Sequence, residues 1–188
     1  MRESKDSEER KDEFIDAAEK LFKENGIVDT TVNAIVKEMD VAKGLFYYYF
    51  KSKDDVIDAI SEKYNTDFKE SIRKSMNQDD FDSRLDQFIE NSIVSFKNMW
   101  GKLHPDSEDI DLSILSNRSV DEAKKIAVKA LQGILEEGNR IGKLAVKNAK
   151  GYAEILISGI CDLTSKEDAD IEEIKSMIED LISKSRKE

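Results

Sequence analysis

Cysteine, histidine and proline are almost absent from this chain, and each shortage excludes a class of protein. One cysteine (Cys161) and one histidine (His104) cannot build a disulfide framework or a zinc site of Cys and His side chains. Proline occurs once, at Pro105, and glycine eight times, so few residues break helices. Because Glu, Lys, Ile and Leu are abundant, the composition predicts an all-α protein.

Long apolar runs are missing as well. No stretch of about 18 or more consecutive apolar residues occurs, so we expect no membrane-spanning segment. Residues 1–13 lack the apolar centre of a secretory signal, and a lone cysteine suits a reducing compartment. These features predict a cytoplasmic protein.

Groups that carry catalysis are also scarce. The sequence has no nucleophile motif and no glycine-rich phosphate-binding loop, and its carboxylates lack the spacing of a metal site. A solvated acidic surface explains those carboxylates equally well. We therefore expect no enzyme activity, no metal ion and no cofactor.

Charge is distributed unevenly along the chain. A net charge of −11 disfavours a protein that coats nucleic acid without specificity. Segment 31–53, however, carries four lysines (Lys37, Lys43, Lys51 and Lys53) against two acidic residues. A local positive charge of this kind is what a phosphate contact requires.

The first 52 residues show the pattern of three helices. Apolar spacing predicts a first helix that ends at Asn25-Gly26, a short helix capped by Thr31, and a third helix over 43–50 after a tight turn. Ser52 and Asp55 then resemble a capping box. We place a domain boundary at this point, with one domain over 1–52 and a second over 53–188.

Six helices are predicted in the second domain. The first begins after residue 52, and the others cover 81–103, 107–116, 120–139, 148–164 and 169–185. The last two have long apolar stripes, formed by Tyr152, Ile155, Leu156, Gly159, Ile160 and Leu163 and by Ile171, Ile174, Ile178, Leu181 and Ile182. A helix that is apolar on most sides is buried on more than one side. The stripes therefore indicate either a central core helix with its packing partner or a subunit interface.

The order of the first three helices is that of a helix-turn-helix unit, whose last helix lies in the DNA major groove. On that helix Phe46 and Phe50 are four residues apart and share the core face, so Tyr48 points outward with Tyr47 and Tyr49 beside it. Alternatively, the tyrosines are half-buried around a small core with only their hydroxyls at the surface.

Residues 30–60, TTVNAIVKEMDVAKGLFYYYFKSKDDVIDAI, resemble the DNA-binding segment of TetR-family transcriptional regulators. The residues that match the family pattern in order and spacing are Thr31, Val32, Ile35, Val41, Lys43, Gly44, Tyr47, Tyr48, Phe50, Lys51, Ser52 and Lys53. Three departures are Ala42 in place of a Ser or Thr N-cap, Leu45 in place of Thr, and Tyr49 in place of His.

The resemblance implies a role for each matching position. The implied DNA contacts are Thr31, Asn33, Lys43, Gly44, Leu45, Tyr47, Tyr48, Tyr49 and Lys53, with Lys53 on a flanking phosphate. The resemblance also assigns the dimer interface to the last two helices, through Tyr152, Ile155, Leu156, Gly159, Ile160, Leu163, Ile174, Ile178 and Leu181.

The middle helices of such a protein would enclose an effector pocket. The candidate lining residues are Tyr64, Phe68, Phe88, Phe96, Trp100 and His104, although aromatic residues at helical spacing more often fill a core. The implied function is a ligand-responsive repressor, a homodimer that binds a palindromic double-stranded DNA operator and is released by an unknown small-molecule effector. The alternative is a TetR-fold adaptor that binds DNA without an inducer.

Overall fold

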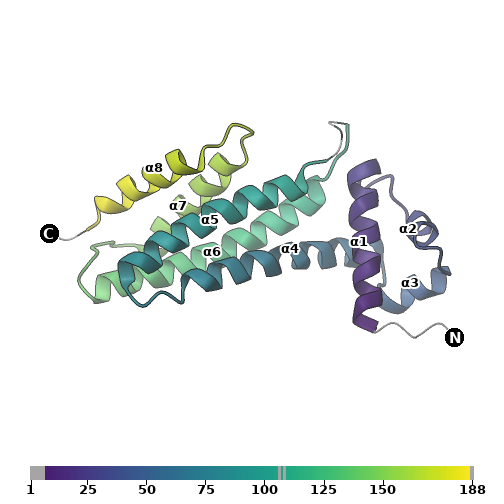
Figure 1. Cartoon of the computed structure of the whole chain (residues 1–188), viewed down its shortest axis with the longest axis horizontal. Coiled ribbons are helices and arrows are strands. Elements are labelled where there is room, and N and C mark those ends of the chain that lie inside the picture. The colour runs from purple at the N-terminus through teal and green to yellow at the C-terminus, as the bar shows by residue number, and fades with distance from the viewer. Residues whose placement is uncertain (1–6, 106, 108, 187–188) are drawn as a thin grey trace. The chain divides into compact units, whose positions relative to one another are not determined.

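The structure is a computed structural model, and it describes residues 7–105, 107 and 109–186. Within these residues the chain forms α-helices joined by short connections, in agreement with the predicted all-α class (Figure 1). The helices are α1 (Ser7–Asn25), α2 (Val32–Glu38), α3 (Lys43–Tyr49), α4 (Lys53–Ser75), α5 (Phe81–Leu103), α6 (Ser113–Arg140), α7 (Ala149–Thr164) and α8 (Ile171–Ser183). In the described part of the chain, no helix is long and apolar enough to cross a membrane.

The described residues from 53 onward form five helices where six were predicted. The predicted helices over 107–116 and 120–139 are one helix, α6. Leu115, Ser119, Ala123 and Ala127 are buried at every fourth position, so a single face of the helix continues through the expected break.

The chain divides into two compact units, which are described separately. The first consists of residues up to 64 and 103–119, and the second of 65–102 and those from 120 onward. The predicted domain boundary lies beside the start of α4 at Lys53. Because α4 contributes residues to both units, that boundary stays a prediction.

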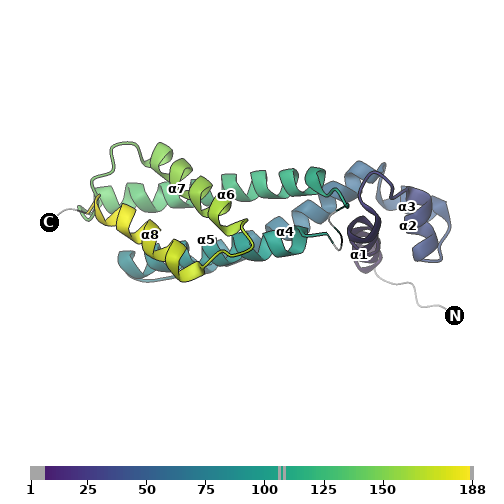
Figure 2. The same cartoon turned by 90° about the horizontal axis from the view of Figure 1, so that it is seen from above.

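The first unit is built around α1, with α2 and α3 beside it (Figures 1 and 2). Phe14 on α1 is fully buried and contacts both predicted anchors of α3. Its ring centroid is 5.8 Å from that of Phe46, edge to face, and 6.2 Å from that of Phe50. Aromatic pairs of this geometry stabilise a small core beyond the area that they bury.

A polar cluster joins α1 to the first half of α4 in this unit. The carboxylate of Glu19 accepts hydrogen bonds from the Tyr64 hydroxyl at 2.6 Å, from Lys63 at 3.1 Å and from Lys23 at 3.1 Å. Burial opposes ionisation of Glu19, but these three donors together hold its pKa below the ordinary value. Burial, together with the same contact with Glu19, raises the pKa of Tyr64.

The second unit is a bundle of the end of α4 with α5, α6, α7 and α8. Side-chain hydrogen bonds and ion pairs join α5 to each of the other helices, and α7 to α8. The pairs that include α5 are Asn91 with Ser71 on α4, Arg84 with Glu137 on α6, Trp100 with the Cys161 carbonyl on α7, and Asp86 and Glu90 with Lys175 on α8. Tyr152 on α7 donates to the Leu181 carbonyl on α8. Figure 2 shows α5 and α8 as neighbours, as the ion pairs of Lys175 require.

Candidate nucleic-acid interface

The α2–turn–α3 segment is defined by local hydrogen bonds. The Thr31 side chain accepts from the Ala34 amide at 3.1 Å, which confirms Thr31 as the N-cap of α2. Asp40 takes a positive φ of 51°, and the Val41 amide closes the turn on the Val36 carbonyl at 3.0 Å. Asp is one of the few residues besides Gly that adopt this conformation, because its short polar side chain can hydrogen-bond to the nearby backbone. The chain therefore reverses tightly enough for α3 to follow α2 closely.

The start of α3 has no side-chain cap. Ala42 occupies the N-cap position in an extended conformation, but it has no side-chain oxygen to accept from the free amides of the first turn. Lys43 and Gly44 at this end are exposed, and a Cβ added at Gly44 would meet no other atom within 4 Å. The open surface leaves room for a phosphate backbone to approach.

The three tyrosines of α3 have different surroundings. Tyr48 is 75% exposed and Tyr47 is 51% exposed, as predicted from the inward positions of Phe46 and Phe50. Tyr49 differs from the prediction, because it is half-buried and its ring lies 5.8 Å from that of Phe14. Since Tyr49 is the last residue of α3, its side chain reaches back to α1, and it supports Tyr48 through an edge-to-face contact at 4.9 Å.

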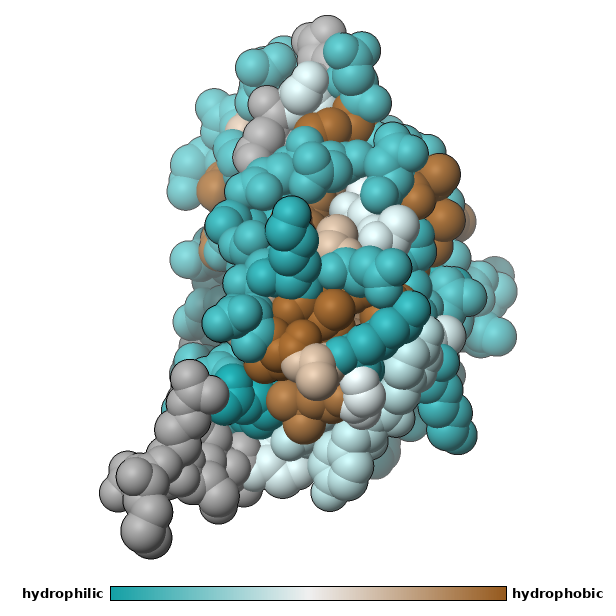
Figure 3. Space-filling view, turned by 90° about the vertical axis from the view of Figure 1, so that its right-hand side faces the viewer, coloured by the Kyte–Doolittle hydropathy of each residue, from teal (hydrophilic) through white to brown (hydrophobic). Residues whose placement is uncertain are grey.

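The surface of this unit combines exposed tyrosines with unpaired lysines. Figure 3 looks onto the end that carries α1–α3, where hydrophobic patches alternate with hydrophilic and intermediate residues. Lys37, Lys43 and Lys51 are exposed and make no ion pair with a described residue, whereas Glu38 is neutralised by Lys20 at 2.7 Å. Lys37 and Lys51 were not among the predicted contacts, although the local charge excess included both.

Two further predicted contacts, Thr31 and Asn33, are exposed at the start of α2, and Leu45 is half-buried on α3. Lys53 differs from this group. Its ammonium donates to the carbonyl oxygens of Ile27, Val28 and Thr30, so it is engaged inside the chain rather than free to reach a phosphate. The predicted phosphate contact of Lys53 would require these bonds to break.

Comparison with known proteins agrees with this arrangement. The family model described as bacterial regulatory proteins of the tetR family matches residues 14–60, the segment from α1 to the first turns of α4. The fatty acid metabolism regulator protein of Bacillus subtilis (strain 168) is 30% identical over 167 residues, which cover 81% of this chain and 79% of that protein. The chain belongs to the TetR family of transcriptional regulators.

Two more TetR-family comparisons extend over most of the chain. The regulator QacR of Staphylococcus aureus (strain Mu50 / ATCC 700699) is 26% identical over 183 residues, covering 89% of this chain and 92% of QacR. The SmeT–triclosan complex has a TM-score of 0.70 at 18% identity, covering 95% of this chain and 92% of that one. SmeT is the repressor of a multidrug efflux pump of Stenotrophomonas maltophilia, and its likeness to this chain is one of fold.

Five of the predicted effector residues of this TetR-family chain are buried or hydrogen-bonded within the chain. Phe68 and Phe96 are buried and pack against each other with ring centroids 4.8 Å apart, and Phe88 is fully buried. Tyr64 bonds to Glu19, and Trp100 donates to the Cys161 carbonyl at 3.1 Å. His104 is exposed beyond the end of α5. Their predicted role in ligand binding stays a prediction.

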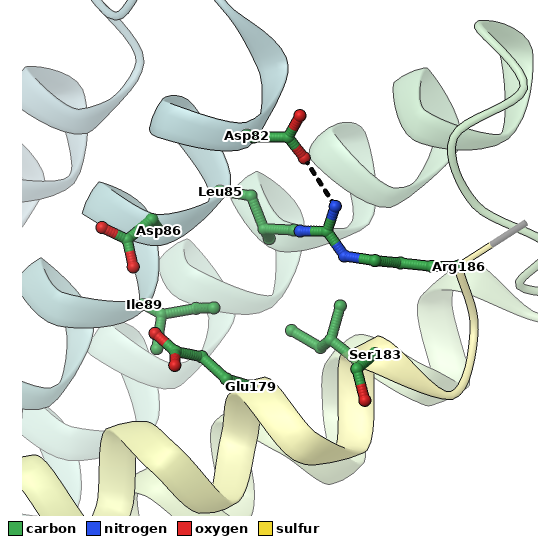
Figure 4. A pocket seen from close by; sticks show the side chains of 8 residues that line it. Asp82, Leu85, Asp86, Ile89, Glu179, Ser183 and Arg186 are labelled. Carbon is green, nitrogen blue, oxygen red and sulfur yellow. Dashed lines mark hydrogen bonds and ion pairs between the residues drawn. The ribbon is translucent and has the colours of Figure 1, made fainter. Parts of the chain in front are cut away.

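A pocket of the second unit lies elsewhere, between α5 and α8 (Figure 4). It has a volume of about 200 Å³ and a floor of Leu85, Ile89 and Ile182. Figure 4 shows Arg186 reaching across it to Asp82, at 2.9 Å. This pair closes one side of the pocket and ties the chain beyond α8 to the start of α5.

The predicted dimer residues separate into two groups. Leu156, Ile160, Ile174 and Ile178 are buried within the subunit, where a partner cannot reach their side chains. Ile155 is 72% exposed, and Leu181 and its neighbour Met177 are also exposed. Tyr152, Gly159 and Leu163 are half-buried. The predicted interface therefore narrows to the outer faces of α7 and α8, because the inner faces already form the subunit core.

Proposed function

We propose that this TetR-family protein is a ligand-responsive repressor that binds a palindromic operator as a dimer. The observation that carries the proposal is the exposure of Tyr47 and Tyr48 on α3, with Phe46 and Phe50 holding the opposite face of the helix in the core. A short helix held in this way presents a fixed set of side chains to base edges and phosphates.

Phosphate contacts in the proposal come from residues around the tyrosines. Thr31 and Asn33 are exposed at the start of α2, and Lys43 and Gly44 at the start of α3. Lys37 and Lys51 add positive charge, and neither makes an ion pair with a described residue. Leu45 and the edges of the tyrosine rings would contact thymine methyl groups, which favours an operator containing A·T pairs.

Two copies are needed to read a palindrome. The outer faces of α7 and α8, with Ile155, Met177 and Leu181 exposed, are the surface that we assign to the partner subunit. A two-fold dimer would place its two α3 helices on successive major grooves, about one helical turn of DNA apart.

For the effector, the described part of the second unit contains a buried hydroxyl without a hydrogen-bond partner. The Ser92 hydroxyl is fully buried on α5 and makes no hydrogen bond. Ser92 lies four residues from Phe88 and four from Phe96, so it shares their face of the helix. An unpaired buried hydroxyl is costly unless a ligand or water satisfies it, which favours a largely apolar effector with one polar group. The solved complex of SmeT with triclosan provides a precedent for a small molecule bound to a protein of this fold.

The test is selection of bound fragments from genomic DNA by the purified protein, followed by sequencing. The expected result is a palindromic site with two half-sites about 10 base pairs apart. Enrichment of no common sequence would refute operator binding. An operator that is bound tightly but released by no member of a library of small apolar compounds would favour the adaptor without an inducer.

A further inference from the structure

Lys53, the first residue of α4, is bound to the loop between α1 and α2. Its Nζ atom lies 2.5 Å from the Ile27 carbonyl oxygen, 2.9 Å from that of Thr30 and 3.3 Å from that of Val28. An ammonium group has three donors, and three backbone carbonyls converge on this one. No donor is left over for a phosphate.

The loop that Lys53 binds is itself well ordered by hydrogen bonds. Thr30 is buried, and its hydroxyl lies 2.7 Å from the Gly26 carbonyl oxygen and 3.1 Å from that of Leu21 at the end of α1. The residue after Thr30 is Thr31, the N-cap of α2. The Thr30 carbonyl and the Thr31 amide belong to one peptide plane, so the ammonium that holds this carbonyl also orients the cap.

The first turn of α4 is also bonded to the short segment that connects it to α3. The Asp55 amide donates to the Ser52 hydroxyl at 3.2 Å, and the Asp55 carboxylate accepts from the Lys51 amide at 2.8 Å. This is the capping box that the sequence predicts. The first turn of α4 therefore contacts the loop before α2 through Lys53 and the segment between α3 and α4 through Asp55.

We infer that Lys53 is a positioning residue for DNA binding, which holds Thr31 and the start of α2 in place instead of contacting a phosphate. The three carbonyl oxygens carry partial negative charge and repel one another unless a cation lies between them. Without the ammonium the loop relaxes, and the N-cap of α2 moves with it. A displacement of the first turn of α4 would shift α2 and α3 together. This inference rests on the proposed function, since it concerns how DNA is bound.

The experiment compares Lys53→Met with Lys51→Met. Both remove one positive charge near the start of α4, but the Lys51 side chain is exposed and makes no ion pair or side-chain hydrogen bond with a described residue. Amide NMR spectra are recorded without DNA, and operator affinity is measured over a series of salt concentrations. For Lys53→Met we expect shifted amides over residues 27–35, about ten-fold weaker operator binding and an unchanged salt slope.

Lys51→Met should leave the amides over 27–35 in place and reduce the salt slope by about 0.9, the value for one lost phosphate contact. Lys53→Arg keeps the charge, and it replaces Lys53→Met in the experiment if Lys53→Met does not fold. A guanidinium is longer and planar, so we expect it to disturb the same amides and weaken binding.

The inference is overturned if Lys53→Met leaves the loop amides unmoved and lowers the salt slope by about 0.9, the value for one lost phosphate contact. It is also overturned if Lys53→Arg binds the operator like the unchanged protein with an undisturbed loop. If the unchanged protein selects no DNA, the proposed function fails. The spectra recorded without DNA still show in that case whether Lys53 holds the loop.

Discussion

At the scale of single residues, neighbouring side chains of the same type have different roles. Tyr48 is exposed and Tyr49 leans on Phe14, although the two are adjacent on one short helix. Lys51 is exposed, whereas Lys53 is bound by three carbonyls. The role of each residue follows from what its side chain touches and not from its type.

Truncation of the tyrosines should separate DNA binding from stability. Tyr48→Ala removes an exposed ring, so we expect the free energy of unfolding to stay within about 0.5 kcal/mol, while operator binding weakens by about ten-fold or more. Tyr49→Ala removes packing against Phe14 and should destabilise the protein by about 1–2 kcal/mol. Urea unfolding and operator titration measure the two effects. Equal losses of stability in both variants would contradict the outward placement of Tyr48.

At the scale of helices, the two short helices of the DNA-binding segment start differently. α2 has a hydroxyl cap in Thr31, whereas Ala42 leaves the first amides of α3 without a side-chain acceptor. Because helices of this length are unstable alone, such caps are a sizeable part of their local stability.

Adding the missing cap should stabilise the protein. Ala42 already has the extended backbone of an N-cap residue, so Ala42→Ser should raise the free energy of unfolding by about 0.5–1 kcal/mol. Thr31→Ala should lower it by about 1 kcal/mol. Ala17→Ser, in the middle of α1, is the control and should give no gain. A gain from Ala17→Ser equal to that from Ala42→Ser would exclude capping as the cause.

The stability that the hydrogen bonds of Glu19 between α1 and α4 contribute should depend on pH. The pKa of Glu19 is lower in the folded protein than its ordinary value of 4.5, because Tyr64, Lys63 and Lys23 donate to the carboxylate. The stability from these bonds is therefore complete above about pH 4.5 and is lost as the pH falls through the lower, folded pKa. Glu19→Gln should reduce the free energy of unfolding by about 1–2 kcal/mol at pH 7.

The difference between the unchanged protein and Glu19→Gln should shrink as the pH falls below about 4. Urea unfolding at a series of pH values measures it. Asp16→Asn is the matched control, since Asp16 contacts Lys63 from an exposed position and is expected to matter less. A difference between the unchanged protein and Glu19→Gln that grows on acidification would have the wrong sign and would reject the assignment.

At the scale of the whole molecule, the place where a partner subunit binds depends on which apolar surfaces remain exposed. Each of α7 and α8 uses one face for the core of its own subunit. Ile155, Met177 and Leu181 remain exposed on the other faces, and their clustering on the last two helices is the reason to expect a partner there.

Charge placed on this surface should prevent dimer formation. Ile155→Glu combined with Leu181→Glu puts two carboxylates into the proposed interface, and we expect a monomer with an unchanged helical content. Val28→Glu is the matched control, because Val28 is 74% exposed but lies in the loop after α1. Sedimentation velocity measures the mass. A double variant that sediments like the unchanged protein would place the interface on another surface.

Several structural features of this protein were determined by its local sequence alone. The all-α class, the cap at Thr31, the capping box at Ser52 and the inward positions of Phe46 and Phe50 all depend on residues within one or two helical turns. Helical periodicity and capping preferences act over such distances, so local sequence is sufficient to predict them. The resemblance to the TetR family depends on the same short segment.

Only the tertiary structure decided the roles that depend on distant partners. Lys53 binds carbonyls 23 to 26 residues earlier in the chain, and Tyr49 reaches a ring on α1. The continuous α6, and the burial of Leu156 and Ile178 inside the subunit, likewise follow from neighbours far away in sequence. Periodicity shows that a face is apolar, but it does not show which surface covers that face. That choice is made when the helices pack.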